Sequence, residues 1–205
     1  DSTAARELLE HASARRQCIW SSDGADQRVN AADGPLLTED GARIARRFDP
    51  PRRLVVSGGD PGALALARLA TDANFETILV RPDGPEAPPP FAVSRYIRSD
   101  VASALAAIGI DRWTAFVGAT HEDHHDLAAC LHALRKGAAW TGMIGAKSRA
   151  GGRMAALEAA GASKDELSQL HLSPGIPGLG KAPWEVATGI LAEVMQAMNP
   201  ARERA

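Results

Sequence analysis

The chain has 205 residues, of which 45% are hydrophobic and 23% are charged, as is usual for a globular protein. Its net charge of −2 gives no basis for a nucleic-acid or membrane surface, and no apolar run approaches the roughly 20 residues that a membrane helix needs. The polar N-terminal stretch DSTAARELLEH lacks the features of a secretory signal, and the two cysteines have no motif spacing. We therefore expect a cytoplasmic protein with reduced thiols.

The first 50 residues differ in pattern from the rest of the chain. Residues 2–16 predict a helix, and QCIWSSDGADQRVN predicts a hairpin because Asp-Gly separates two β-prone pieces. A second helix is expected from Thr38 to about Arg47, and the paired prolines of FDPPRR mark a boundary. The predicted organisation is a short or diverged α+β segment over 1–50, a main domain over 51–198 and a frayed tail over 199–205.

From Arg52 onward, strand-like apolar runs alternate with longer helical patterns. Such alternation predicts βαβ units, which place parallel strands in one sheet. We therefore predict an α/β fold, a Rossmann-like open parallel sheet with helices on both faces. The predicted strands are 53–57, 76–80, 94–98, 113–118 and 140–143, and the predicted helices are 60–73, 100–108, 122–136, 147–161 and 183–197.

A glycine cluster follows the first strand, in VVSGGDPGALALARLA. The dinucleotide fingerprint G-x-G-x-x-G has the same order of strand, tight turn and helix. Ser57 replaces its first glycine, Gly58 follows, and Gly59 and Gly62 retain the second and third. These glycines let a phosphate approach a helix N-terminus, and the third allows close packing of helix on strand, so a bulky residue at Gly62 is expected to damage folding and binding. A tight turn that binds nothing is the alternative.

Arg81 ends the second predicted strand, in TILVRPDG, where the fingerprint has an acidic residue. An acid there accepts hydrogen bonds from the adenosine ribose, whereas an arginine suits a phosphate such as the 2′-phosphate of NADP. NAD(P) is therefore a candidate cofactor. The alternative is a solvated arginine at a strand end that contacts no nucleotide.

The segment His121-Glu122-Asp123-His124-His125 contains the letters of the zinc motif H-E-x-x-H. In zinc hydrolases this motif lies inside a helix, whereas here it follows a strand and opens a helix, and no third ligand is evident. We therefore predict no metal. The functional interpretation is a group of polar residues at the carboxyl end of a central strand, where open α/β sheets bind ligands. The alternative is a simple helix cap.

A second glycine turn lies in WTGMIGAKSRAGGRM, where Gly145 precedes Lys147 and Arg149 at a helix start. Backbone N–H groups and these two cations would form an anion cradle, unless both side chains are simply solvated. A glycine- and proline-rich loop then runs from His171 to Lys181, before Pro183 opens the last helix. A loop of this length is often functional.

Three segments together resemble the Rossmann domain of the XdhC/CoxI family: TH near the end of the fourth strand, GMIGAKSRA, and LHLSPGIPGLGKAPWEVATGILAE. Members of this family are accessory proteins of xanthine dehydrogenase and related molybdenum hydroxylases. The resemblance covers about residues 52–198. It implies a protein that binds the molybdenum cofactor (molybdopterin), protects it while a cysteine desulfurase places the terminal sulfur, and helps to insert it into a xanthine dehydrogenase-type hydroxylase.

The sequence departs from the family pattern at several positions. Ser57 replaces a glycine, Asp60 a histidine and Arg81 an aspartate, and the glycines of the last loop are shifted. The family's glycine-flanked cysteine has no counterpart, because Cys18 lies in RRQCIWSS. The resemblance and the glycine turns together predict these cofactor-binding residues, with no catalytic residue: Ser57, Gly58, Gly59, Gly62, Arg81, His121, Gly145, Lys147, His171, Lys181 and Glu185.

Two other functions stay open. One is an NAD(P)-dependent oxidoreductase with His121 as the acid–base group, although Tyr96, the only tyrosine, is followed at the fourth position by Asp100 rather than by the lysine of short-chain dehydrogenases. The other is a nucleotide-sensing module. A homodimer is expected only because homodimers are the commonest oligomers.

Overall fold

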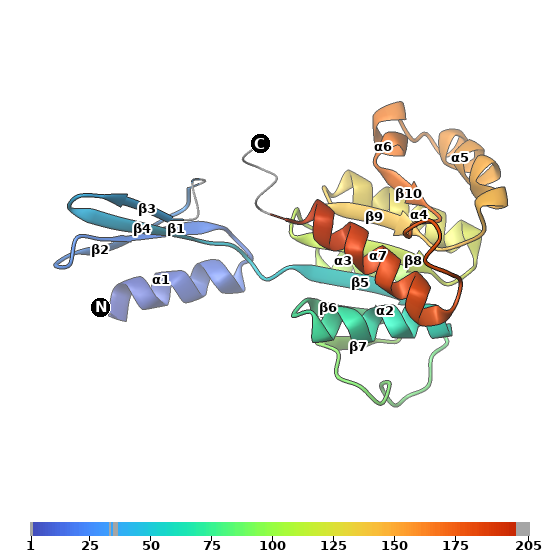
Figure 1. The fold of residues 1–205 in the computed structure, drawn as a ribbon, viewed down its shortest axis with the longest axis horizontal. Coiled ribbons are helices and arrows are strands. Elements are labelled where there is room, and N and C mark those ends of the chain that lie inside the picture. Colours follow the sequence, from blue (N-terminus) through green and yellow to red (C-terminus); the bar gives the residue numbers. More distant parts are fainter. Residues whose placement is uncertain (1, 33, 35–36, 200–205) are drawn as a thin grey trace. The chain divides into compact units, whose positions relative to one another are not determined.

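The computed structural model describes residues 2–32, 34 and 37–199 (Figure 1). The chain divides into two compact units, Asp1–Pro51 and Arg52–Ala205. Among the described helices, none is long and apolar enough to cross a membrane.

The first unit is a small α+β fold. Its sheet is antiparallel, and the strand order is β2-β1-β4-β3. The predicted hairpin is confirmed, because β1 and β2 flank the Asp23-Gly24 turn and pair from Ser22–Gln27 outward. The elements are α1 (Ser2–Ser13), β1 (Cys18–Ser22), β2 (Gln27–Asn30), β3 (Leu37–Asp40) and β4 (Arg43–Phe48).

The predicted helix between Thr38 and Arg47 is wrong, because this segment forms the hairpin of β3 and β4. Asp40 and Gly41 supply the Asp-Gly turn, and Gly41 has a φ of +40°. Glycine adopts such angles without a Cβ penalty, and Asp-Gly is a strong hairpin signal. The turn chemistry therefore outweighs the helical spacing of the apolar residues.

The second unit contains a six-stranded sheet in the order β10-β9-β8-β5-β6-β7, and every pair is parallel. Read from β7, this is the 3-2-1-4-5-6 order of dinucleotide-binding folds. The predicted Rossmann-like sheet is therefore confirmed. The strands are β5 (Arg53–Gly58), β6 (Glu76–Val80), β7 (Arg95–Ile97), β8 (Thr114–Ala119), β9 (Trp140–Met143) and β10 (Leu170–Leu172).

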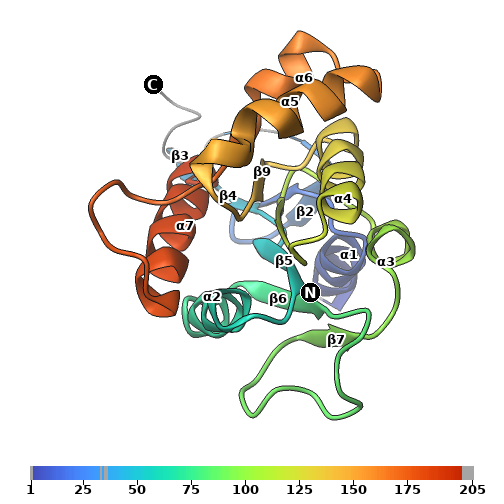
Figure 2. The same cartoon turned by 90° about the vertical axis from the view of Figure 1, so that its right-hand side faces the viewer.

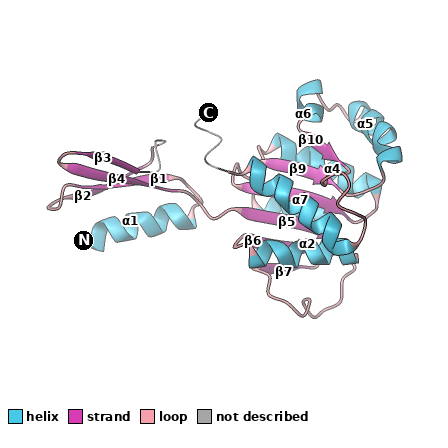
Figure 3. Cartoon of the chain, in the orientation of Figure 1, coloured by secondary structure: helices cyan, strands magenta, loops and turns pink. Residues whose placement is uncertain are grey.

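Helices cover both faces of this sheet (Figures 2 and 3). Leu54 and Val56 of β5 pack against one pair of helices, and Val55 faces the other cluster. All six residues of β5 are buried, as expected for a central strand covered on both sides. The helices on the first face are α2 (Pro61–Asp72) and α7 (Pro183–Ala197), and those of the second cluster include α3 (Val101–Ile108), α4 (Asp123–Arg135), α5 (Ala150–Ala159) and α6 (Lys164–Ser168).

The five predicted strands and the predicted helices of this unit are confirmed, with bounds that agree to within two residues except in the fourth helix. That helix begins with a 3₁₀ turn over Lys147–Arg149, and its α-helical part ends at Ala159. Two short elements were not predicted, α6 and β10. His171 and Leu172 of β10 lie in the loop that the sequence predicted from His171 to Lys181, and the strand was missed because three residues carry no measurable alternation.

The turn after β5 shows which glycine is required for packing. Gly58 has a φ of +132°, and a Cβ on it would collide with the backbone carbonyl of Ala119 in β8. Gly62 lies in the first turn of α2, where a Cβ would meet only the Asp60 carboxylate at an ordinary 3.6 Å. The expectation that Gly62 provides close helix–strand packing is therefore wrong, and Gly58 has that role.

We predict that Gly58→Ala lowers the free energy of unfolding by about 3 kcal/mol or more, because it combines backbone strain with a clash in the sheet. Gly62→Ala should be neutral or stabilising by up to about 1 kcal/mol, because alanine favours the helix. Urea unfolding of both variants measures the difference. Equal losses in the two variants would contradict this assignment.

Candidate functional site

Two cavities lie at the carboxyl edge of the parallel sheet, where open α/β sheets bind ligands. The first, here called the β5–β6 cavity, has a volume of about 270 Å³. The second, the loop cavity, has a volume of about 580 Å³ and lies between the turn after β9 and the loop that precedes α7. The two share no lining residue in the part of the chain that is described.

The β5–β6 cavity brings together four segments that are distant in sequence. The turn after β5 and the segment after β6 form part of its wall, and the start of α3 and the segment after β8 complete it. Its lining residues with charged or titratable side chains are Arg81, Asp83, Asp100, Glu122 and His125. Of the predicted binding residues, Gly58, Gly59 and Arg81 lie here.

The guanidinium of Arg81 lies close to Gly59 in the glycine turn. A Cβ on Gly59 would come within 2.6 Å of the Nη2 atom of Arg81, so this glycine is required for the arginine to lie there. No hydrogen bond or ion pair occupies the guanidinium among the described residues. The cation is therefore available to a ligand in the cavity.

The N-terminus of α2 is capped by the chain itself. Asp60 accepts a hydrogen bond from the backbone N–H of Ala63 at 2.6 Å, and Pro61 contributes no N–H. In dinucleotide-binding folds these donors face a pyrophosphate. Here the Asp60 carboxylate takes one of them and also pairs with Nε2 of His121 at 2.8 Å.

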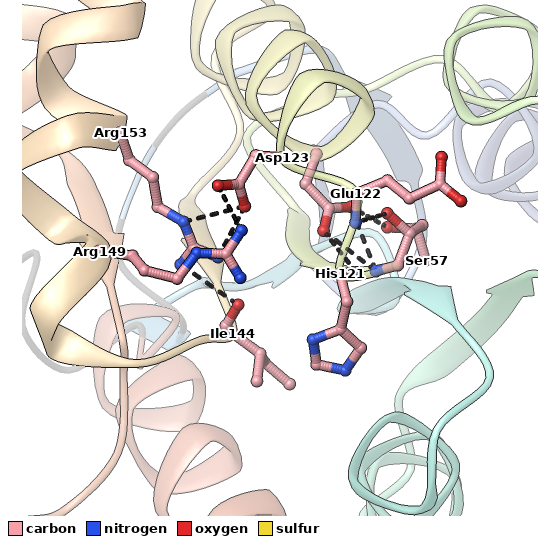
Figure 4. Close-up of polar contacts among 9 residues, drawn as sticks. Ser57, His121, Glu122, Asp123, Ile144, Arg149 and Arg153 are labelled. Atoms are coloured by element: carbon pink, nitrogen blue, oxygen red, sulfur yellow. Dashed lines mark hydrogen bonds and ion pairs between the residues drawn. The ribbon is translucent and has the colours of Figure 1, made fainter.

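His121 has a φ of +67°, an unusual backbone angle for a residue with a side chain. The buried carboxylate of Asp126 stabilises this turn, because its Oδ2 accepts hydrogen bonds from the N–H groups of Thr120 at 3.0 Å and His121 at 3.2 Å. Burial raises the pKa of Asp126, although these hydrogen bonds act in the opposite direction. The exposed ring of His121 lines neither cavity (Figure 4).

Ser57 is fully buried beneath this turn. Its Oγ lies 3.4 Å from the carbonyl oxygen of Val117 and 3.5 Å from Oδ1 of Asp126. The hydroxyl therefore contacts the protein interior, and its position offers no contact to a ligand in either cavity. The sequence suggested that Ser57 could donate a hydrogen bond, and the acceptors that the structure provides are internal.

A buried arginine holds the turn after β9 in place (Figure 4). The side chain of Arg153 is 1% exposed, and its Nη2 lies 2.9 Å from Oδ1 of Asp123. Its Nη1 lies 3.4 Å from the carbonyl oxygen of Ile144, and a Cβ on Gly145 would collide with the guanidinium. Hydrogen bonds from Arg153 and then Arg149 lower the pKa of Asp123. Arg149 is thus paired with Asp123 at 2.6 Å rather than free for an anion.

The loop cavity contains the remaining cations. Lys147 and Lys181 line it together with Gly145, and neither lysine has a polar partner among residues 2–32, 34 and 37–199. Ser173 also lines the cavity, and its Oγ is buried without a hydrogen-bond partner. Two lysines without a described polar partner therefore border the cavity, and the Ser173 hydroxyl is buried in its wall.

Two other predicted residues stabilise this loop. Glu185 lines the cavity, but its carboxylate also accepts a hydrogen bond from the N–H of Ala182 at 2.8 Å, which caps α7. His171 lies in β10, stacks on Trp140 with ring centroids 4.8 Å apart, and contacts Glu193 at 3.5 Å. It therefore lines neither cavity.

The H-E-x-x-H letters do not form one site, since His121 pairs with Asp60. The group of metal-ligand type that the described residues contain is Glu122, His124 and His125, whose ligand atoms lie within 4.8 Å of one another. All three are exposed at the start of α4, and the helix dipole there disfavours a cation.

The sequence motifs and this geometry agree with a family comparison. The family model of the XdhC Rossmann domain matches residues 54–194. The chain belongs to this family. The predicted resemblance is thereby confirmed for the second unit. No curated protein matches the chain.

One solved structure shares the fold of this XdhC-family chain at low identity, and two others match it with lower scores. A protein described as a xanthine dehydrogenase from Bacillus halodurans is 18% identical with a TM-score of 0.70, and the match covers 98% of this chain and 64% of that one. The chain thus spans less than two thirds of that relative. An NAD-dependent epimerase/dehydratase from Methylobacillus flagellatus is 16% identical over 74% of this chain and 61% of that one, with a TM-score of 0.38. The GsuK RCK domain is 14% identical over 97% and 42%, with a TM-score of 0.41.

Sequence reasoning missed several residues that shape this XdhC-family site. Asp60 precedes Pro61 at a helix start, which is a recognisable N-cap signature. Asp126 and Arg153 carried no such signal, because each lies inside a helix whose polar residues are usually solvated. Their burial depends on contacts with Thr120 and Asp123, which only the folded chain brings close.

We predict that Asp123→Ala lowers the free energy of unfolding by about 3 kcal/mol, because it leaves the buried Arg153 cation unpaired. Replacing both groups, as in Asp123→Ala with Arg153→Met, should recover much of this loss. Arg149→Ala removes the exposed partner of the same aspartate and should cost under about 1 kcal/mol. Urea unfolding measures all three, and a larger loss for Arg149→Ala than for Asp123→Ala would refute the assignment.

The same aspartate should affect the pH dependence of stability. Because the pKa of Asp123 is lowered in the folded state, its contribution is present above the unfolded pKa and disappears as the pH falls through the folded pKa. The loss of stability on acidification should therefore be shallower in Asp123→Ala, as measured by urea unfolding between neutral pH and about pH 3.

Proposed function

We propose that this chain is an accessory protein that binds the molybdenum cofactor and assists its sulfuration and insertion into a xanthine dehydrogenase-type molybdenum hydroxylase. The loop cavity is the observation that carries this proposal. It belongs to the matched XdhC Rossmann domain and combines two free lysines with glycine-rich backbone.

The cofactor fits the chemistry of this cavity. Molybdopterin ends in a phosphate, and ammonium groups are common phosphate ligands. Lys147 and Lys181, which both line the cavity, would bind that phosphate from two sides. When bound, the cofactor supplies the redox-active metal that the client enzyme uses.

The protein residues would bind and orient the cofactor rather than react with it. Gly175 and Gly178 have φ values of +132° and +85°, which glycine adopts without a Cβ penalty, so the loop can turn sharply around the cavity. The N–H of Gly175 donates to Glu193 of α7 at 2.6 Å, which fixes the loop to a helix. This anchoring pre-organises the cavity, which reduces the entropy lost on binding.

A client enzyme and a cysteine desulfurase are the proposed partners. Ile176, Leu179 and Trp184 are 48%, 39% and 49% exposed, and they lie in or directly after the loop that lines the cavity. Exposed apolar groups beside a ligand cavity suit a protein that docks onto the recipient of its ligand. The expected homodimer stays a prediction.

We predict that Lys147→Ala and Lys181→Ala each weaken binding of molybdopterin about tenfold, as expected for the loss of one charge-assisted hydrogen bond. Lys136→Ala is the matched control, because Lys136 is exposed at the C-terminus of α4 and lines neither cavity. Anaerobic calorimetry with purified cofactor measures the affinities. Unchanged affinity in both cavity variants would refute the site.

His121→Ala tests how far the ligand extends along the sheet edge. The family motif assigns His121 to cofactor binding, so the sequence predicts weaker retention in this variant, whereas the geometry places its ring outside both cavities. A loss of affinity would extend the site to the end of β8. Unchanged affinity would restrict it to the loop cavity.

A further inference from the structure

The β5–β6 cavity is separate from the cavity that we assign to the molybdenum cofactor, and it has its own cation. It lies beside the crossover between β5 and β8, where the order of the strands reverses. In doubly wound folds the ribose of a nucleotide occupies this end, next to the last residue of the second strand. Arg81 follows β6 at that point.

Arg81 is placed to bind a phosphate group on a ribose. Its guanidinium lies over Gly59 and has no polar partner among the described residues. An arginine presents several N–H donors in a planar fork that matches phosphate oxygens, whereas ribose hydroxyls at this position are matched by a carboxylate. The residue therefore favours a phosphorylated ribose over a free one.

The start of α3 provides a hydrogen-bond acceptor and a donor that could bind a nucleotide base. Asp100 lines the cavity, and its Oδ1 accepts a hydrogen bond from the N–H of Ser103 at 2.9 Å, which leaves Oδ2 for a ligand. The adjacent N–H of Val101 is in the first turn of the helix and has no partner within the described chain. A carboxylate beside an N–H matches a base that has an amino group beside a ring nitrogen, as adenine and cytosine have.

We infer that the β5–β6 cavity binds a 2′-phosphorylated nucleotide whose base is adenine or cytosine. Arg81 binds the 2′-phosphate, and Asp100 with the N–H of Val101 reads the base. The volume of about 270 Å³ lies just below the usual range of small-molecule sites, so it suits a single nucleoside unit rather than a whole dinucleotide.

The other charges around the cavity explain why the 2′-phosphate is distinguished from a 5′-phosphate. Asp83, Asp100, Glu122 and His125 also line the cavity, and the His125 ring lies 3.4 Å from the Glu122 carboxylate, so Arg81 is the permanently charged cation that a phosphate meets there. Asp60 places a carboxylate on the α2 N-terminus, where a 5′-phosphate would otherwise find N–H donors. A 5′-phosphate at the start of α2 therefore meets the Asp60 carboxylate, whereas a 2′-phosphate meets the Arg81 guanidinium.

Calorimetry on the full chain tests the phosphate contact with adenosine, adenosine 2′-monophosphate and adenosine 5′-monophosphate. We expect the wild type to bind the 2′-monophosphate at least tenfold more tightly than the other two. Arg81→Asp should abolish this preference, while adenosine should bind at least as tightly as it does to the wild type, because a carboxylate at this position accepts hydrogen bonds from ribose hydroxyls. Arg95→Asp makes the same change of charge at an exposed residue of β7 outside the cavity and should retain the preference.

The base contact is tested on the wild type, which avoids any change of fold. Guanosine 2′-monophosphate presents an oxygen beside a ring N–H, the reverse of the adenine edge, and should bind at least tenfold more weakly than the adenine compound. Cytidine 2′-monophosphate then distinguishes the two allowed bases. Equal binding of the guanine and adenine compounds would overturn the base assignment.

Absence of binding by every nucleotide, or an unchanged 2′-phosphate preference in Arg81→Asp, would overturn the inference. The result is independent of the molybdenum cofactor, because Lys147→Ala should leave nucleotide affinity unchanged. Loss of cofactor binding with intact nucleotide binding, or the reverse, therefore separates failure of one proposal from failure of the other.

Discussion

The buried carboxylate of Asp126 is the contact on which the ligand edge of the sheet depends. It accepts hydrogen bonds from two consecutive N–H groups after β8 and lies beside the hydroxyl of Ser57 in β5. These bonds connect the two central strands to the first turn of α4. Because burial disfavours the charged form, the site retains this carboxylate at an energetic cost that its hydrogen bonds partly offset. The turn that carries His121 and borders the β5–β6 cavity takes its shape from this arrangement.

The Asp123–Arg153 pair supports the turn after β9, as Asp126 supports the turn after β8. It joins the start of α4 to α5 and supports the backbone at Gly145, where the loop cavity begins. Asp126 and Asp123, both in the first turn of α4, thus position the borders of the β5–β6 cavity and the loop cavity, respectively. The cavities can therefore differ in charge and shape although they share the same sheet edge.

The architecture of the second unit was predictable because its signals are local and repeated. Five apolar strands alternate with helices that have clear starts, and a parallel sheet follows from that order. The hairpin of β3 and β4 was not predicted, since the apolar spacing of LTEDGARIARRF fits a helix and the decisive Asp40-Gly41 turn is a two-residue signal. Glycine and lysine positions at the two cavities were also predictable, because they follow strand ends. The pairing of buried charges was not, since an aspartate or arginine in a helix gives no sign that it will be buried.

The self-capped start of α2 affects how the protein behaves without a ligand. In many nucleotide-binding folds the bound phosphate completes the helix terminus, so the empty protein has an unsatisfied end. Here Asp60 and His121 complete that end from within the chain. Under the proposed function, the protein has to remain folded after it has delivered its cofactor and before it binds the next. A terminus that needs no cargo to be satisfied gives the same local structure in the loaded and the empty protein.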